Sequence, residues 1–353
     1  MNAQEFWQKF YTWGQRSDEV IPGYTIMLTV PGDLPVFTKI ALEICSRQRS
    51  DHLVETLVIP DQLTAGLPEL LEAWAKDYVI SPIRLVPLTA LDQLLAQKLN
   101  HPSLTHWLQL FRAGIVTRTT HAVLHDTDLF MIDSNFLKIH YETCVNRRLA
   151  CLGVSPIWDS WFSDQKIHHV VATWEMMFEL DWLRSFEPWQ HQAHENVIDG
   201  KWYRFDTTLW TQCRTVPERV GRHEQEAGFI HFGHVISSYR WFQQSPRPYE
   251  DEQFRLLLIR LLIDAYDPFG WPYDVPSMDE LTAGLVDAAN RVIYLKDSTR
   301  QRYPQFRYQL QQLIQSGLLS EKRTSILKNG IASFDRALGW SGGSDRLDRF
   351  PSS

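Results

Sequence analysis

The sequence has 353 residues, enough for one large domain and a smaller one, with an ordinary globular balance of 44% hydrophobic and 22% charged residues. A formal net charge of −7 and the lack of any Lys/Arg block argue against a nucleic-acid binder, because such proteins present a basic face. Anionic small molecules are not excluded, because a bound metal ion can supply positive charge locally.

The cysteines and the N-terminus bear on the cellular compartment. No two cysteines form a CxxC pair, so neither a zinc ribbon nor a redox dithiol is indicated, and scattered cysteines fit a reducing compartment. The first residues, MNAQEFWQKF, lack the basic and apolar regions of a signal peptide. No stretch reaches the roughly 18 uncharged apolar residues that a membrane span needs. We therefore expect a cytoplasmic protein with no transmembrane segment.

Apolar runs and turn residues alternate through the first 130 residues. An aromatic-rich stretch over residues 1–20 predicts a short N-terminal helix, after which strands alternate with helices. The predicted strands cover 24–30, 53–59, 83–87 and 121–124, and the predicted helices cover 34–47, 67–77 and 103–114. This alternation predicts an α/β fold with a mostly parallel sheet. Right-handed crossovers would place the carboxyl ends of the strands along one edge, where open α/β sheets bind ligands.

The pattern changes after residue 150. Residues 151–248 are rich in tryptophan, histidine and loop residues, whereas helical periodicity returns from about residue 249. Three helices are predicted there, over 250–266, 278–295 and 303–319. The sequence thus predicts four regions: an N-terminal helix (1–20), an α/β domain (21–248), a helical C-terminal region (249–338) and a flexible tail (339–353).

The segment HAVLHDTDLFMID, residues 121–133, carries the strongest chemical signal. Side chains two residues apart on an extended chain point the same way, so Asp126 and Asp128 share a face at the end of a predicted strand. Two converging carboxylates suit Mg²⁺ or Mn²⁺, which prefer oxygen ligands. Acidic residues between apolar runs are costly to bury without a cation or dense hydrogen bonding. The alternative is a turn in which the aspartates cap the local backbone.

In their order along the chain, these elements resemble the GT-A class of nucleotide-sugar glycosyltransferases. The resemblance covers about residues 24–242: a first strand TIMLTV, a strand that ends at Asp61, the segment SLTHWLQLFRAGIVTRTTHAVLHDTDLFMID with its Asp-x-Asp element, and FIHFGH at 229–234. It implies a GT-A domain over 21–248, with a Rossmann-like, mostly parallel sheet flanked by helices. It also implies transfer of a sugar from a UDP- or GDP-linked donor to a carbohydrate or other hydroxyl acceptor.

The resemblance also implies roles for single residues. Asp128 and Asp126 would bind the metal ion, Mn²⁺ or Mg²⁺, and the sugar nucleotide. A histidine, His231 or His234, would complete the metal site, and the His-Phe-Gly element favours His231. Four further residues would line the nucleotide pocket beside Asp126: Thr29, Pro31, Asp61 and His106. The alternatives are packed or exposed histidines and a loop-capping role for the aspartate after the second strand.

The catalytic base is the hardest residue to place. An inverting transferase needs a carboxylate that takes the proton of the acceptor hydroxyl. The segment ATWEMMFELDW, 172–182, offers Glu175, Glu179 and Asp181. If a helix begins near Thr173, Glu175 and Glu179 lie on one face, four residues apart. Glu175 best matches the base of GT-A enzymes, which often lies at the start of a helix, and Asp181 is the next candidate; a solvated helix face is the alternative.

Two other functions compete with glycosyl transfer. A sugar-phosphate nucleotidyltransferase would need a glycine-rich basic loop after the first strand, where this chain has Pro31-Gly32-Asp33. A carbohydrate-binding protein that kept the fold and lost turnover is the second. The lack of a Gln-x-x-Arg-Trp element argues against a processive polysaccharide synthase of the cellulose type. The C-terminal helices could serve acceptor binding, homo-oligomer formation or cover of the sheet.

Overall fold

The structure, a computed structural model, describes residues 3–15, 19–49, 51–78, 81–99, 101–154, 160–198, 200–223, 228–244, 253–267, 270–283 and 296–340. Two compact units divide the chain. The first unit comprises Met1–Thr127 and Asp133–Phe229, and the second unit comprises Asp128–Ile132 and Ile230–Ser353. The main boundary predicted from the sequence lies later, at residue 248. The predicted tail lies outside the described residues from residue 341 onward.

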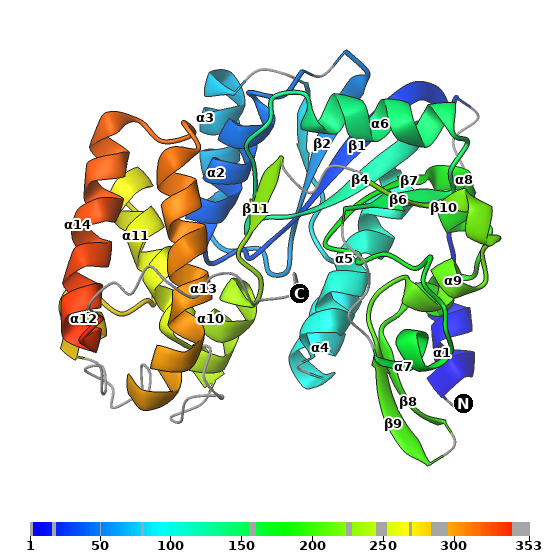
Figure 1. Cartoon of the computed structure of the whole chain (residues 1–353). Helices are drawn as coiled ribbons and strands as arrows, with labels where there is room; N and C mark the ends of the chain where they lie inside the picture. The colour runs from blue at the N-terminus through cyan, green and yellow to red at the C-terminus, as the bar shows by residue number, and fades with distance from the viewer. Residues whose placement is uncertain are drawn as a thin grey trace. The chain divides into compact units, whose positions relative to one another are not determined.

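A seven-stranded sheet forms the centre of the first unit (Figure 1). Its strands, in spatial order, are β10 (Val220–Arg222), β6 (Cys151–Gly153), β7 (Glu175–Glu179), β4 (Thr119–Asp126), β1 (Ile21–Val30), β2 (Leu53–Pro60) and β3 (Ile83–Leu85). All neighbouring pairs are parallel except those of β7, which is antiparallel to both β4 and β6. The chain leaves β1 towards β2 and β3 and returns on its other side as β4. The strand order therefore reverses between β1 and β4, the kind of position at which open α/β sheets bind ligands.

Helices and one hairpin complete the first unit. The helices are α1 (Ala3–Phe10), α2 (Pro35–Cys45), α3 (Leu67–Asp77), α4 (Ala90–Leu99), α5 (Pro102–Val116), α6 (Phe136–Asn146), α7 (Ser160–Asp164), α8 (Leu180–Arg184) and α9 (Leu209–Cys213), and the hairpin joins β8 (His194–Ile198) to β9 (Lys201–Phe205). The helices α2, α3 and α5 carry proline in the first turn, where its fixed φ favours helix initiation and its missing N–H costs no hydrogen bond.

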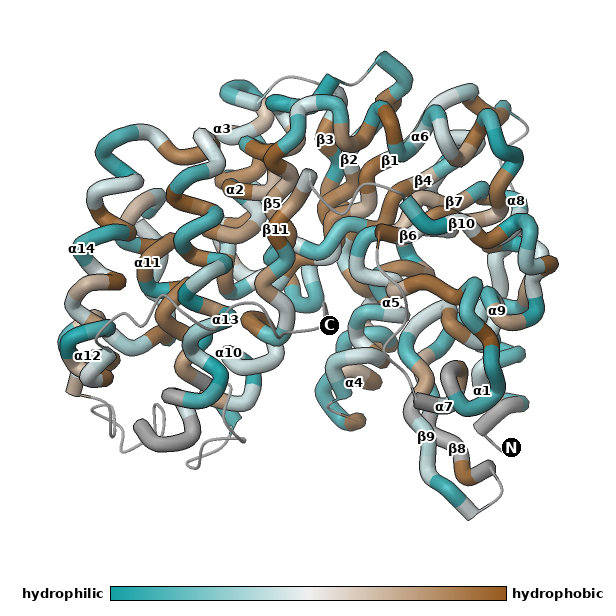
Figure 2. The backbone as a smooth tube through the Cα atoms, in the orientation of Figure 1, coloured by the Kyte–Doolittle hydropathy of each residue, from teal (hydrophilic) through white to brown (hydrophobic). Residues whose placement is uncertain are grey.

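Burial on both faces explains the composition of the central strands. In β1 every residue from Gly23 to Val30 is buried, as expected of parallel strands that are covered on both sides. Figure 2 shows the hydrophobic colour along β1, β2 and β4. Tyr11, just after α1, packs its ring 5.1 Å from that of Trp107 on α5. The aromatic N-terminal segment therefore docks on the core of its own unit.

The second unit pairs a small sheet with helices. Its strands β5 (Leu129–Met131) and β11 (Phe229–His231) form a two-stranded sheet, and its helices are α10 (Val235–Gln244), α11 (Leu256–Tyr266), α12 (Met278–Ala283), α13 (Lys296–Gln315) and α14 (Glu321–Leu338). The apolar helix α11 packs against α10 and α14. Gly330 allows this approach, because a Cβ atom there would lie 2.3 Å from a methyl group of Leu261.

The predicted α/β class with a mostly parallel sheet is confirmed. The helix prediction over 172–182 is wrong in its first half: Glu175–Glu179 forms β7, and α8 begins only at Leu180. The reason is that β7 pairs with strands on both sides and is covered on both faces, so Met176, Met177 and Phe178 are all buried. Of the predicted C-terminal helices, residues 250–252 and 284–295 lie outside the described part of the chain. Among the described helices, none is long and apolar enough to cross a membrane.

Candidate functional site

The carboxyl ends of β1, β2 and β4 meet at one edge of the sheet. In the register of the sheet, Thr29 on β1 stands opposite Asp126 on β4 and opposite Ile59 on β2. The loop after β2 returns to β1, where the N–H of Asp61 donates to the carbonyl of Val30 at 3.0 Å. The topology thus brings three predicted site residues, at the ends of three neighbouring strands, to the edge at which the strand order reverses.

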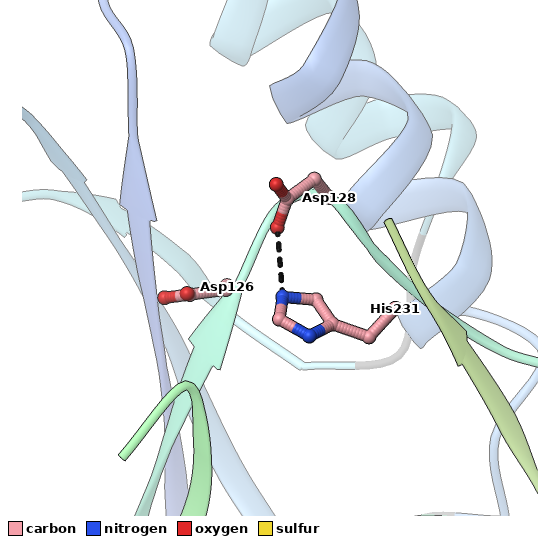
Figure 3. A group of neighbouring side chains, drawn as sticks. All are labelled: Asp126, Asp128 and His231. Carbon is pink, nitrogen blue, oxygen red and sulfur yellow. Dashed lines mark ion pairs between the residues drawn. The ribbon is translucent and has the colours of Figure 1, made fainter. Parts of the chain in front are cut away.

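Asp126, Asp128 and His231 form a candidate metal centre (Figure 3). Asp126 is the last residue of β4, and only Thr127 separates it from Asp128. Within the second unit, His231 at the end of β11 lies with its Nε2 3.4 Å from Oδ1 of Asp128. One ligand atom from each of the three residues lies within 4.8 Å of the others. The two carboxylates suit Mn²⁺ or Mg²⁺, and the imidazole favours the transition metal Mn²⁺ of the two, so the donor set fits the predicted cation.

Local contacts hold His231 in place. The N–H of Phe232 donates to the carbonyl of Asp128 at 3.1 Å, which ties the end of β11 to the start of β5. Gln309 on α13 donates to the carbonyl of His231 at 2.7 Å, and Arg255 donates to the carbonyl of Phe232 at 2.6 Å. These bonds fix the backbone at His231 and at the residue that follows it.

The surroundings of Asp128 keep its carboxylate charged. Burial alone would raise the pKa of Asp128, but the hydrogen bond from His231 and the electrostatic interactions with His231, His234 and Arg255 outweigh it, and the pKa lies below its ordinary value. At neutral pH the side chain therefore carries a negative charge, the form that binds a cation.

His106 on α5 stands beside Asp126 in the first unit. Its Nε2 lies 3.6 Å from Oδ1 of Asp126. Burial lowers the pKa of His106, and the negative charge of Asp206 offsets this only in part, so the imidazole is neutral at pH 7. Asp206 follows β9 directly and is half-buried, which makes it a further carboxylate near this edge. Asp206 was not among the predicted site residues, although an aspartate directly after a run rich in aromatic residues, KWYRF, is a signal that the sequence carries.

The loop after β1 is closely packed. The N–H of Gly32 donates to Oδ1 of Asp61 at 2.9 Å, so this aspartate does bind a loop backbone. A Cβ atom at Gly32 would lie 1.8 Å from the carbonyl oxygen of Gln62, so only glycine fits. Gln109 on α5 donates to the carbonyls of Val30 and Ile59, at 3.2 and 2.6 Å. Pro31 is buried within the same loop.

Glu175 is enclosed, not exposed to an acceptor. Its side chain has no exposed surface, and its Oε2 lies 2.5 Å from Nδ1 of His125, which is also buried. Its Oε1 lies 4.0 Å from Nδ1 of His140, and burial lowers the pKa of His140 to about 3, so that ring is neutral. The preceding residue, Trp174, accepts the N–H of Asp126 at 3.0 Å. The Glu175–His125 pair is therefore the last cross-strand pair of β4 and β7 before Asp126.

Asp181 lies at the other edge of the sheet. The strand β7 is antiparallel to β4, so it leads away from Asp126, and Glu179 at its end stands opposite His121 near the start of β4. Asp181 follows on α8, and its negative charge acts on His121. The structure does not bring Asp181 to the metal centre.

No protein-family model and no curated protein matches the sequence. Among solved structures, the chain is similar to S. aureus TarS 1–349 in complex with UDP-GlcNAc, at 13% identity and a TM-score of 0.39 over 90% of this chain and 89% of that one. It is also similar to the mannosyltransferase PcManGT from Pyrobaculum calidifontis in complex with GDP-Man and Mn²⁺, at 14% identity and a TM-score of 0.34 over 95% and 91% of the two chains.

A third solved structure is glucosyl-3-phosphoglycerate synthase from Mycobacterium tuberculosis in complex with phosphoglyceric acid. It is 11% identical, with a TM-score of 0.36 over 57% of this chain and 69% of that one. The resemblance to glycosyltransferases that the sequence suggested is thus also found among solved structures. At such low scores and identities the likeness by itself carries no function to this chain.

Proposed function

We propose that this chain is a divalent-metal-dependent glycosyltransferase that moves a sugar from a nucleoside diphosphate sugar to an acceptor hydroxyl. The observation that carries the proposal is the cluster of Asp126, Asp128 and His231, which begins at the carboxyl end of β4, next to the point where the strand order reverses. Its support comes from the donor set, the charge of Asp128 and the neighbouring ends of β1 and β2. A site with these features suits a cation and a diphosphate together.

The cluster residues would hold the cation, and their charge explains why a cation is needed. Asp128 keeps a pKa below its ordinary value, and Asp126 adds a second carboxylate, so the bare site would repel a diphosphate. A bound Mn²⁺ or Mg²⁺ supplies positive charge that stabilises the diphosphate leaving group. His231 would be the third protein ligand of this cation.

Residues at the same edge of the first unit would bind the nucleotide. Thr29, Pro31 and Asp61 belong to the ends of β1 and β2, and His106 lies beside Asp126. The neutral imidazole of His106 can hydrogen-bond a ligand without adding charge. The nucleobase of the donor, uracil or guanine, stays a prediction. So do the acceptor, the stereochemistry and the cytoplasmic location.

For the base, we propose Asp206 in place of Glu175 and Asp181. A general base must reach the acceptor hydroxyl. Glu175 is fully buried, and Asp181 lies at the other edge of the sheet, so neither is well placed to act as the base. Asp206 is half-buried and acts electrostatically on His106. It lies two residues before Thr208, whose φ of 64° is rare for a β-branched residue. Such strain concentrates at functional sites.

The test is hydrolysis and transfer with UDP- and GDP-sugars in the presence of Mn²⁺ and then of chelator. We expect slow release of UDP or GDP in the presence of metal. Removal of the metal or the substitution Asp128→Asn should abolish this release. A carbohydrate-binding protein would bind sugar without releasing nucleotide. A nucleotidyltransferase would instead release pyrophosphate from a nucleoside triphosphate and a sugar phosphate. Either of those results would contradict the proposal.

A further inference from the structure

A cavity of about 580 Å³ opens on the first unit, at the sheet edge opposite Asp126. It lies between the start of β4, the end of β7 and the C-terminal turn of α6. The loop from α6 to β6 and the two residues before β10 complete its walls. Its lining residues are His121, Cys144, Val145, Arg147, Arg148, Leu149, Glu179, Glu218 and Arg219. The volume falls in the range of sites for small molecules. Because these residues belong to one unit and to the opposite edge, the cavity is separate from the proposed donor site.

Among the residues that the structure describes, two arginines of this cavity have no side-chain partner. Arg219 forms an ion pair with Glu179 at 2.5 Å, so the charges of that couple offset each other. Arg147 and Arg148 are exposed, and neither forms an ion pair or a side-chain hydrogen bond with any residue that the structure describes. The three arginines and two glutamates of the lining leave one net positive charge. Arginines that line a cavity favour an oxyanion, because the planar N–H groups of a guanidinium match its paired oxygens.

The backbone at Arg148 supports a role for its side chain. At the end of α6 the N–H of Arg148 donates to Val145 at 3.0 Å, and the next N–H, of Leu149, donates to Cys144 at 2.9 Å. Arg148 itself has a φ of 52°, in the left-handed region that glycine usually occupies at this position of a helix end. An arginine that lines the cavity thus stands where glycine would be favoured, and such backbone strain concentrates at functional sites.

The remaining walls add a neutral and an apolar contribution. Burial lowers the pKa of His121, and the negative charges of Glu179 and Asp181 offset this lowering only in part. The imidazole is therefore neutral at pH 7. Val145 leaves 39% of its surface exposed beside the arginines. The cavity thus offers charge, a neutral hydrogen-bonding ring and an apolar patch, the mixture typical of small-molecule sites.

We propose that this cavity binds a small molecule through an oxyanion group, a phosphate or a carboxylate, held by Arg147 and Arg148. The inference goes beyond the proposed glycosyl transfer and does not depend on it. Glu218, the glutamate of the lining that is not paired with Arg219, limits the ligand to a small anion, because a highly charged one would meet its repulsion.

The test uses calorimetric titration of the full chain with inorganic phosphate, and in a second arm with succinate. The protein is first treated with chelator, and the chelator is then removed by buffer exchange, so that neither metal-bound phosphate nor the chelator's own carboxylates contribute. The expected result is binding by the wild type that Arg148→Gly weakens by about tenfold or more. Because glycine fits the left-handed conformation, Arg148→Gly should keep its melting temperature or raise it by roughly 1 to 3 °C. A loss of binding without a loss of stability separates ligand contact from a structural role.

Lys166→Gly is the matched control. Lys166 is exposed, has a φ of 57° and lies outside the cavity, so this variant also removes one positive charge and relieves the same backbone strain. It should bind like the wild type. Arg147→Ala is a second variant with ordinary helix-end backbone, and it should also lose binding.

The outcomes are distinct. Phosphate binding that both arginine variants lose and the control keeps supports a phosphate site, and the same pattern with succinate alone supports a carboxylate site. Equal binding by the wild type and Arg148→Gly overturns the proposal. So does the absence of binding of either anion to the wild type at about 10 mM.

Discussion

Replacing Glu175 tests how the strand that ends at Asp126 is held. Glu175 and His125 are both fully buried, and their 2.5 Å contact is the last cross-strand pair before the backbone bond from Asp126 to Trp174. Glu175→Ala removes one partner of this buried pair and leaves the imidazole of His125 without its carboxylate partner. The substitution should lower the free energy of unfolding by about 3–5 kcal/mol. Glu175→Gln keeps the volume and one hydrogen bond, and should cost roughly 1–3 kcal/mol.

The assay is urea unfolding, followed by Mn²⁺-dependent nucleotide binding of each variant. Glu179→Gln is the matched control, because Glu179 lies on the same strand at the other end, where it is partly exposed and paired with Arg219. This control should lose no more than about 1 kcal/mol. Glu175→Gln should also weaken metal-dependent binding, by up to about tenfold, because the end of β4 that carries Asp126 is less well held.

Two results would refute this reasoning. If Glu175→Gln keeps its stability and its metal-dependent binding but loses transfer, then Glu175 is the catalytic base, as the sequence suggested, despite its burial. If Glu175→Ala and Glu179→Gln cost the same small free energy, the buried pair with His125 does not support the strand.

Three further predictions concern the site and the stability of the first unit. Asp206→Asn should lower transfer by about 10²-fold or more and leave nucleotide binding intact, and an unchanged transfer rate would remove Asp206 from the mechanism. Gly32→Ala places a Cβ atom 1.8 Å from the carbonyl oxygen of Gln62; it should cost at least about 1–3 kcal/mol in urea unfolding and weaken nucleotide binding, so a fully stable variant would contradict the packing. Burial would raise the pKa of Asp92, but its hydrogen bonds to Arg112 and Thr89 and the charge of Arg112 lower it below its ordinary value. Its stabilisation is therefore present above the unfolded pKa of about 3.9 and lost as the pH falls through the lower folded pKa, so the melting temperatures of wild type and Asp92→Asn should differ above about pH 5 and converge in acid.

Sequence patterns sufficed for the elements that local chemistry determines. The strands β1 and β2 are continuous apolar runs that end in proline and aspartate, which allows their prediction without any knowledge of the sheet. Asp126 and Asp128 stood out because carboxylates between apolar runs need an explanation. The topology that unites these ends follows from the alternation of strands and helices.

The sequence pattern failed where long-range packing decides the structure. In EMMFE the two glutamates are four residues apart, as on one face of a helix, but β7 lies between two strands and is buried on both faces, so it shows no strand alternation. The burial of Glu175 depends on His125, fifty residues away, which no local rule can pair with it. His231 is more than a hundred residues from Asp128, and only the resemblance, not spacing, suggested that it belongs to the site.

The most direct test of the central claim is titration of the full chain with UDP and GDP, first with Mn²⁺ and then with chelator, followed by tryptophan fluorescence. Asp128→Asn is measured in parallel, because asparagine keeps the shape of the side chain and removes its charge. We predict that the wild type binds one of the two nucleotides only with metal, and that Asp128→Asn loses this metal-dependent binding while its unfolding curve stays close to that of the wild type. Equal binding by both proteins, unaffected by chelator, would show that Asp126 and Asp128 form a structural turn and would contradict the glycosyltransferase proposal.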